Sequence, residues 1–314
     1  MAAATVKPMV PFEPTVDAEN LKKSMKILGT NEDAIIEILT KRTSLQRQEI
    51  LRQYRLAYDK DLVKDLKHHL HGKFEDVVLA LMTPLPEYLA HELHRAMKGK
   101  GTNERVLIEI LCTNDNKSIK AIKAAYEEQN GKSLEKAVKE ETSGDFKKLL
   151  EDLVSCDREE DECRPELASE LAKELFDEGK GKLGTDEDKL RRILTTYSYS
   201  TLRCVFVEYQ KLAGSSLETD LRSELSGDFM EAMLAVYSSI QNPANFFARE
   251  LHATMKGVGT RDRALTRLIV SRCEVDTKTI KTEFIDIYGK TLEKAIKGET
   301  HGDYKKVLLA LIDG

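Results

Sequence analysis

The chain contains 314 residues, of which 49 are basic and 54 acidic, and its formal net charge is −5 at neutral pH. An apolar content of 41% and a charged content of 33% are typical of a globular protein and exclude disordered and fibrous classes. An acidic chain lacks the basic face that nucleic-acid phosphates require, so no nucleic-acid partner is expected. Five cysteines in a chain of this length favour a reducing compartment over a disulfide framework.

The apolar runs are too short to span a membrane. The two longest, residues 77–82 and 307–312, each hold six residues, whereas a spanning helix needs about 20. The first residues also lack the apolar centre of a signal peptide. The composition does not exclude a membrane surface as a partner, provided that a cation bridges the acidic protein to anionic lipids.

Two short signatures recur four times along the chain. The first is a Gly-Thr pair, whose glycines are Gly29, Gly101, Gly184 and Gly259. The second is a glycine two positions before an aromatic residue, at Gly72, Gly144, Gly227 and Gly302. Because both signatures recur in a fixed order, they predict four related units of about 70 residues each.

In chain order, the sequence divides into a tail, two repeats, a linker and two more repeats. Residues 1–14 form a short, proline-marked tail without an amphipathic helical pattern for a partner to capture. The remaining segments are expected at 15–84 (repeat 1), 85–155 (repeat 2), 156–166 (an acidic linker), 167–240 (repeat 3) and 241–314 (repeat 4).

The periodicity inside each unit is helical. After the second signature, apolar residues fall at i, i+3, i+4 and i+7, which places them on one buried helix face. The four sets are Phe74, Val77, Val78, Leu81; Phe146, Leu149, Leu150, Leu153; Phe229, Ala232, Met233, Val236; and Tyr304, Val307, Leu308, Leu311. Further helix breaks are expected at 58–62, 130–134, 213–217 and 288–292. The sequence therefore predicts an all-α protein with about five short helices per repeat.

Each Gly-Thr pair is expected to open a helix. The hydroxyls of the four threonines, Thr30, Thr102, Thr185 and Thr260, are suited to accept a hydrogen bond from a first-turn N–H, as N-caps do. An acidic residue follows each of them within two positions, which suits the positive end of the helix dipole.

The loops before these helices have the chemistry of a calcium site. In repeats 2 and 4, two glycines flank a single residue, and glycine permits conformations in which successive carbonyl oxygens point to one place. Calcium takes six to eight oxygen ligands, many of them backbone carbonyls. A carboxylate should complete the site, and Glu141, Glu224 and Glu299 each follow the second loop glycine by 40 positions.

With these loops and distant carboxylates, the sequence resembles the annexin family from about Asp17 to the C-terminus. The resemblance implies a curved disc of four five-helix repeats, with calcium loops on its convex face. It also implies calcium-dependent binding to acidic phospholipids such as phosphatidylserine, without enzymatic activity. Carried over residue by residue, it implies three ligand sets: Met97, Gly99 and Gly101 with Glu141; Gly179, Lys182 and Gly184 with Glu224; and Met255, Gly257 and Gly259 with Glu299.

Repeat 1 departs from this pattern. The position of the carboxylate is taken by His69, and Ile27 replaces the first loop glycine. A neutral imidazole is a poor calcium ligand. The main site of repeat 1 is therefore expected to be lost, which leaves a minor site formed by the Thr30 carbonyl and Glu32.

The loop tips carry candidate lipid contacts. Lys98, Lys100 and Lys256 are suited to anionic headgroups, while Leu183 and Val258 are suited to the interfacial region of a bilayer. The expected location is the cytoplasm, with calcium-driven recruitment to the inner face of membranes. The expected roles are peripheral membrane organisation, trafficking or repair, with self-association on the membrane as a further candidate property.

Two alternative functions remain open at this point. One is a helical-repeat scaffold that binds proteins. The other is a calcium-linked ion channel, because Glu92, Glu109 and Arg272 match charged channel-lining positions of annexins, although Asn114 stands where many annexins carry Arg. These charges are equally suited to salt bridges between repeats. The chain has no nucleotide-binding or hydrolase motif, so no enzyme is expected.

Two smaller clusters have simple interpretations. The spacing of His68, His69 and His71 would allow a transition-metal site, but spacing is the only feature that supports one. The favoured interpretation is an exposed helix end. Cys156 and Cys163 flank the acidic linker and are expected to be free thiols.

Overall fold

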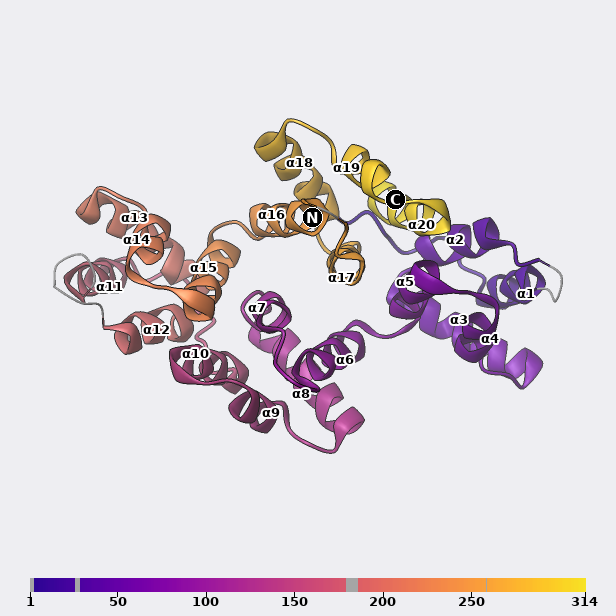
Figure 1. Ribbon diagram of the computed structural model, residues 1–314, viewed down its shortest axis with the longest axis horizontal. Coiled ribbons are helices and arrows are strands. Elements are labelled where there is room, and N and C mark those ends of the chain that lie inside the picture. Colours follow the sequence, from indigo (N-terminus) through magenta and orange to yellow (C-terminus); the bar gives the residue numbers. More distant parts are fainter. Residues whose placement is uncertain (1–2, 26–28, 179–185, 258) are drawn as a thin grey trace. The chain divides into compact units, whose positions relative to one another are not determined.

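The computed structural model describes residues 3–25, 29–178, 186–257 and 259–314. Within these ranges it contains twenty helices and no strand, so the predicted all-α fold with five helices per repeat is confirmed (Figure 1). Repeat 1 holds α1 (Pro14–Ser24), α2 (Glu32–Thr40), α3 (Ser44–Tyr58), α4 (Leu62–His69) and α5 (Gly72–Met82). Repeat 2 holds α6 (Leu85–Met97), α7 (Glu104–Leu111), α8 (Asn116–Asn130), α9 (Leu134–Glu141) and α10 (Gly144–Ser155).

The second half of the chain follows the same order of helices. Repeat 3 holds α11 (Pro165–Glu178), α12 (Glu187–Thr196), α13 (Tyr199–Ala213), α14 (Leu217–Glu224) and α15 (Gly227–Gln241). Repeat 4 holds α16 (Pro243–Met255), α17 (Asp262–Arg272), α18 (Thr277–Tyr288), α19 (Leu292–Glu299) and α20 (Gly302–Asp313).

The four predicted breaks between the third and fourth helix of each repeat are confirmed. Each third helix ends on a residue in the left-handed conformation, which satisfies its last carbonyls. These residues are Asp59, Gly131, Gly214 and Gly289. Each fourth helix then starts at a side-chain N-cap, formed by Asp61, Ser133, Ser216 and Thr291. The turn chemistry therefore fixes these boundaries locally.

The apolar stripes of the last helix in each repeat form the core. All the predicted stripe residues of α5, α10 and α20 are buried. In α15 the stripe is buried from Ala232 onward, whereas Phe229 is only half-buried. The stripes therefore pack against neighbouring helices.

The helices form two compact units. Unit 1 comprises residues 1–88 and 244–314, and so contains repeats 1 and 4, while unit 2 comprises residues 89–243 and contains repeats 2 and 3. In unit 1, α5 packs against α17 and α20, and α2 against α20. In unit 2, α10 packs against α12 and α15 in the same manner.

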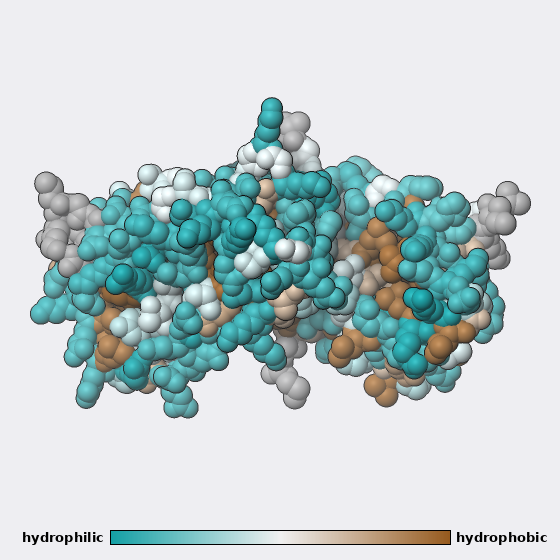
Figure 2. Space-filling view, turned by 90° about the horizontal axis from the view of Figure 1, so that it is seen from below, coloured by the Kyte–Doolittle hydropathy of each residue, from teal (hydrophilic) through white to brown (hydrophobic). Residues whose placement is uncertain are grey.

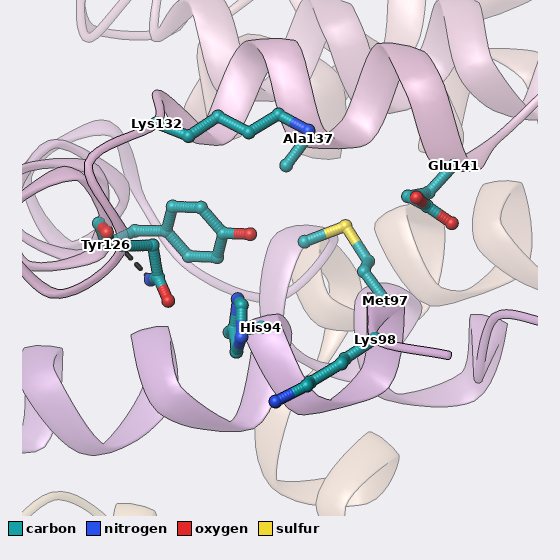
Figure 3. Close-up of a pocket in the computed structure, with 8 residues that line it drawn as sticks. His94, Met97, Lys98, Tyr126, Lys132, Ala137 and Glu141 are labelled. Carbon is teal, nitrogen blue, oxygen red and sulfur yellow. Dashed lines mark hydrogen bonds between the residues drawn. The ribbon is translucent and has the colours of Figure 1, made fainter.

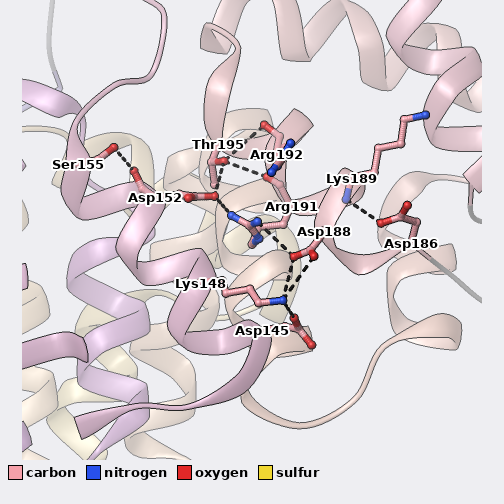
Figure 4. A network of polar contacts seen from close by, with 10 residues as sticks. All are labelled: Asp145, Lys148, Asp152, Ser155, Asp186, Asp188, Lys189, Arg191, Arg192 and Thr195. Carbon is pink, nitrogen blue, oxygen red and sulfur yellow. Dashed lines mark hydrogen bonds and ion pairs between the residues drawn. The ribbon is translucent and has the colours of Figure 1, made fainter. Parts of the chain in front are cut away.

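A lysine on the last helix of one repeat reaches the second helix of its partner in both units. In unit 2, the Lys148 ammonium lies 3.1 Å from Asp188 and 3.0 Å from Asp145 (Figure 4). In unit 1, Lys306 lies 2.8 Å from Asp33 and also pairs with Asp303. Because these pairs are well exposed, solvent screens them and they contribute little, and the buried apolar face remains the main source of stability.

The ionic network of unit 2 also reaches the interior. Arg191 of α12 is buried and pairs with Asp152 of α10 and, at 3.2 Å, with Asp188 (Figure 4). Thr195 donates to the same Asp152 carboxylate at 3.2 Å. Hydrogen bonds from Lys148 and Arg191 hold the pKa of Asp188 below its ordinary value. The interface between α10 and α12 therefore has defined polar partners as well as apolar contacts.

Repeats 1 and 4 share a buried arginine. Arg47 of α3 is buried and donates to the carbonyls of Leu81 (2.7 Å), Leu39 (3.1 Å) and Arg42. Its guanidinium also lies 2.8 Å from the carboxylate of Glu274, which follows α17. One side chain thereby connects two repeats that lie at opposite ends of the sequence.

The N-terminal tail also contacts both repeat 1 and repeat 4. The backbone N–H groups of Thr5 and Val6 donate to the Cys273 carbonyl, and the Thr5 hydroxyl donates to Leu311. Further along, Met9 exchanges two hydrogen bonds with the Gln46 side chain of repeat 1. The described part of the tail contains no helix before Pro14.

The prediction of free thiols is wrong for Cys163. Cys163 is bonded to Cys204 of α13, while Cys156 is free and buried. The linker lies along the start of α13, since Ser200 donates to the Asp161 carbonyl at 2.7 Å and the Glu159 N–H donates to Thr196. This path brings Cys163 to a partner 41 residues away, which local spacing does not reveal.

The face of the molecule in Figure 2 is mainly hydrophilic. On the face in Figure 2, apolar residues gather only in small patches between polar ones. None of the helices in the described ranges is long and apolar enough to cross a bilayer.

Candidate functional site

The Gly-Thr loops of repeats 1, 2 and 4 close in the same way. In repeat 2, the Asn103 N–H donates to the Ala96 carbonyl at 2.8 Å across the loop between α6 and α7. The equivalent bonds join Arg261 to Thr254 at 2.8 Å in repeat 4, and Asn31 to Ser24 at 2.9 Å in repeat 1. The loops of repeats 1, 2 and 4 therefore share one scaffold.

The loop glycines adopt conformations that other residues avoid. Gly99 and Gly101 have φ values of +111° and +89°, and Gly257 and Gly259 have +107° and +83°. An added Cβ at any of them would meet no atom within 4 Å, so the requirement for glycine is conformational and not steric. This agrees with the prediction that the loops need unusual backbone geometry.

Thr30, Thr102 and Thr260 are not N-caps, contrary to the sequence prediction. The cap lies one residue later, for example at Asn31, which accepts from the Ala34 N–H. The Thr102 hydroxyl instead donates to the Glu141 carbonyl at 3.1 Å, and Thr260 donates to Glu299 at 3.1 Å. Thr185 lies outside the described residues. The threonine thus ties each loop to the end of a helix about 40 residues away.

These threonine bonds bring the predicted carboxylates to the loops. Glu141 is the last residue of α9 and Glu299 the last residue of α19, and both are exposed. The Thr102 bond places the end of α9 at the loop that holds Met97, Gly99 and Gly101, and the Thr260 bond places the end of α19 at the matching loop of repeat 4. In repeat 3, Glu224 ends α14 and is exposed, whereas its predicted partners Gly179, Lys182 and Gly184 lie outside the described residues.

The oxygen atoms available at the loop of repeat 2 are suited to bind a hard cation. In the described part of the chain, no hydrogen bond uses the carbonyls of Met97, Gly99 or Gly101 as acceptor. Within the same ranges, no three His, Cys, Asp or Glu side chains lie together as a metal cluster. A metal at this loop would therefore be bound mainly by main-chain oxygens with Glu141, which is a donor set suited to calcium.

Repeat 1 retains the scaffold without the carboxylate. Gly29 has a φ of +86°, and Thr30 donates to the His69 carbonyl at 3.5 Å. Ile27 lies outside the described residues. Glu32 opens α2 and is half-buried, as is Thr30. The imidazole at position 69 thus stands where repeats 2 and 4 present a carboxylate.

The candidate lipid contacts are only partly described. Lys98, Lys100 and Lys256 are all exposed at the loops. Leu183 and Val258 lie outside the described residues. Away from the loops, His68 and His71 are exposed and the His68 and His69 rings meet edge to face at 5.3 Å, as expected for a helix end.

A pocket beside the repeat 2 loop has no counterpart in the sequence prediction. It has a volume of about 170 Å³, and the residues that line it include His94, Lys98, Tyr126, Lys132, Ala137 and Glu141 (Figure 3). Burial, together with nearby cations such as Lys98, holds the pKa of His94 below its ordinary value. A comparison of the repeats at position 137 would have given the signal for this pocket.

Comparison with known proteins identifies relatives along the whole chain. The Annexin family model matches residues 16–81, 88–153, 171–236 and 246–311. Annexin B10 of Drosophila melanogaster is 45% identical over 311 residues, which cover 98% of this chain and 97% of that protein. The solved structure of annexin III has a TM-score of 0.96 at 41% identity and covers 99% of this chain and 97% of its own. A calcium-bound annexin (Sm)1 structure has a TM-score of 0.91 at 36% identity, with 99% of this chain and 93% of that chain covered.

Proposed function

The chain belongs to the annexin family, and from this premise we propose that it binds anionic phospholipid membranes when calcium occupies the loops of repeats 2, 3 and 4. The observation that carries the proposal is the bond from Thr102 and Thr260 to the helix ends that carry Glu141 and Glu299. In repeats 2 and 4, this bond brings the residue that would supply the carboxylate to the glycine loop, which supports the proposal. The calcium-bound structure of annexin (Sm)1 supports the choice of metal.

Each residue of the loop has a separate role in this proposal. The carbonyls of Met97, Gly99 and Gly101 and the carboxylate of Glu141 would hold the ion in repeat 2. When bound, calcium supplies positive charge and coordination positions that lipid oxygens can enter. Lys98 and Lys100 are exposed beside the loop and would add about 1 kcal/mol each toward anionic headgroups.

The sites would act together on one membrane. A single carboxylate compensates little of the charge of a divalent cation, so each site alone should be weak. Linked sites that engage the same surface gain from effective concentration, so avidity exceeds the affinity of any one loop. We propose that the sites of repeat 3, with Gly179, Lys182, Gly184 and Glu224, and of repeat 4 contribute in this manner.

The direct test is sedimentation with phospholipid vesicles. We expect the protein to sediment with phosphatidylserine-containing vesicles in calcium and to remain in the supernatant when a chelator is added. Pure phosphatidylcholine vesicles serve as the uncharged control and should retain little protein. Sedimentation that persists in the chelator would contradict the proposal and favour a calcium-independent scaffold.

Repeat 1 offers a gain-of-function test. In crystals soaked with calcium, we expect no fully occupied metal beside Ile27 in the natural chain, because the carboxylate is replaced by His69. The double substitution Ile27→Gly and His69→Glu should add one ion and lower the calcium concentration needed for vesicle binding. Full occupancy at the natural loop would show that Thr30, Glu32 or other groups suffice.

The cellular role follows as a further part of the proposal. We propose a cytoplasmic protein that calcium recruits to the inner face of membranes, where it would serve membrane organisation, trafficking or repair. Among the residues that match channel positions, Glu92 and Glu109 are buried, and Arg272 pairs with Asp276 at 2.5 Å and stacks on the Phe247 ring at 4.3 Å. These contacts suit a structural role for that arginine.

A further inference from the structure

The pocket beside the repeat 2 loop differs from the same place in repeats 1 and 3. In repeat 1, the equivalent of Ala137 is Asp65, whose carboxylate accepts from the Tyr54 hydroxyl at 2.6 Å and from the Lys22 ammonium at 3.2 Å. Burial opposes the ionisation of Asp65, but these two hydrogen bonds outweigh it and hold its pKa below the ordinary value. The place that is a pocket in repeat 2 is therefore filled in repeat 1 by the Asp65 carboxylate.

Repeat 3 repeats the arrangement with different donors. Asp220 stands at the position of Asp65 and accepts from the Tyr209 hydroxyl at 2.9 Å. The Ser215 hydroxyl donates to the same carboxylate oxygen at 2.6 Å. In both repeats a tyrosine from the third helix therefore donates to a carboxylate from the fourth helix.

Repeat 2 retains the donors and lacks the carboxylate. Tyr126 occupies the position of Tyr54, and His94 occupies the position of Lys22, with their rings 6.1 Å apart. Ala137 has no acceptor to offer the tyrosine hydroxyl, which points into the pocket (Figure 3). Lys98 and Lys132 also line this space, and Lys132 pairs with Glu140 at 2.5 Å. Glu141, on the loop side, is the one carboxylate among the described residues that line it.

We propose that this pocket binds a phosphate monoester, whose oxygens take the place that the Asp65 and Asp220 carboxylates hold in repeats 1 and 3. Lys98, Lys132, His94 and the Tyr126 hydroxyl are its binding groups. A phosphate carries more charge and more acceptor oxygens than a carboxylate, which matches the two lysines and the larger space. The site needs no calcium, but it shares Lys98 and Glu141 with the proposed membrane site, so the two functions are tested with separate readouts.

Repeat 4 explains why the proposal is confined to repeat 2. It also has alanine at this position, Ala295, but Phe284 replaces the tyrosine and removes the hydroxyl donor. Its histidine, His252, stacks on Tyr288 with ring centroids 3.8 Å apart and planes 12° from parallel. The aromatic stack thus engages the histidine that in repeat 2 faces the pocket.

The test is a titration with glycerol 3-phosphate in a chelator at constant pH and ionic strength, followed through the histidine NMR resonances. We expect a saturable shift of the His94 resonance, assigned from the His94→Gln variant. Ala137→Asp should weaken binding at least about tenfold, since it installs the resident carboxylate of repeats 1 and 3. The matched Ala295→Asp variant in repeat 4 should bind as the natural chain does.

Tyr126→Phe provides a second variant that tests the site without adding a charge. It should weaken binding several-fold, because one donor to a charged group is lost. Absence of a His94 shift, an equal shift with chloride, or unchanged binding in both Ala137→Asp and Tyr126→Phe would overturn the proposal. Vesicle binding by these variants in calcium reports on the membrane function separately.

The source of the phosphate is distinguished with vesicles. Ala137→Asp and Ala295→Asp are compared on phosphatidic acid vesicles, which expose a phosphate monoester, at limiting calcium. Weaker binding of Ala137→Asp alone would assign the pocket to a lipid headgroup. Equal vesicle binding, together with loss of glycerol 3-phosphate binding, would assign it to a soluble phosphate monoester.

Discussion

Replacing Glu141, Glu224 and Glu299 together with glutamine should abolish calcium-dependent sedimentation with phosphatidylserine vesicles. Glutamine keeps the size of the side chain and one carbonyl oxygen but removes the charge. Because each proposed site has a single carboxylate, its calcium affinity should fall on the order of 10- to 100-fold. Loss at three sites also removes avidity, so binding should disappear at calcium concentrations that saturate the natural chain.

The matched control changes the same number of charges elsewhere. Glu128, Glu162 and Glu231 are exposed and belong to no proposed calcium site. Their replacement by glutamine gives the same net charge, so a general electrostatic effect would appear in both triple variants. We expect the control to sediment normally. Normal sedimentation of the Glu141, Glu224 and Glu299 variant would refute the proposed mode of membrane binding.

Arg47→Met should be the most destabilising single substitution proposed for this chain. The guanidinium is buried, donates to three backbone carbonyls and pairs with Glu274. Methionine fills part of the volume but leaves these acceptors without a donor. We expect the free energy of unfolding to fall by about 3 kcal/mol, measured as a lower urea midpoint.

An arginine on the same helix provides the control. Arg52 of α3 is 61% exposed and pairs with Glu49 one turn away. Arg52→Met should leave the urea midpoint close to that of the natural chain, because solvent screens the exposed pair. In hydrogen exchange, Arg47→Met should reduce protection in residues 1–88 and 244–314 more than in residues 89–243, because its partners all lie in unit 1. Equal stability of both arginine variants would contradict this role.

The features that could be predicted from the sequence are those that depend on residues close together in the chain. The breaks after Tyr58, Asn130, Ala213 and Tyr288 follow from a left-handed residue and an N-cap within a few positions. The apolar period of each last helix likewise lies within twelve residues. Fourfold repetition strengthened both signals, since an accidental pattern would not recur in the same order.

The features that were missed depend on partners far along the chain. The Thr102 hydroxyl suits an N-cap on local grounds, but its acceptor is the carbonyl of Glu141, 39 residues later. The partner of Cys163 depends on the path of the linker along α13. In the sequence, the pocket at Ala137 appears only as a carboxylate that repeats 1 and 3 have and repeat 2 lacks, and the tyrosine bonds of Asp65 and Asp220 give that difference its meaning.

The pairing of the first repeat with the last has a consequence for folding during synthesis. Residues 89–243 are continuous and can complete their packing while the ribosome still makes the remainder. Residues 1–88 must instead wait for α17 and α20, which pack against α5. Until then, α5 has its contacts with α3 and α4 but lacks those with α17 and α20, so part of its apolar face is uncovered and the newly made first repeat is the segment most in need of chaperone protection.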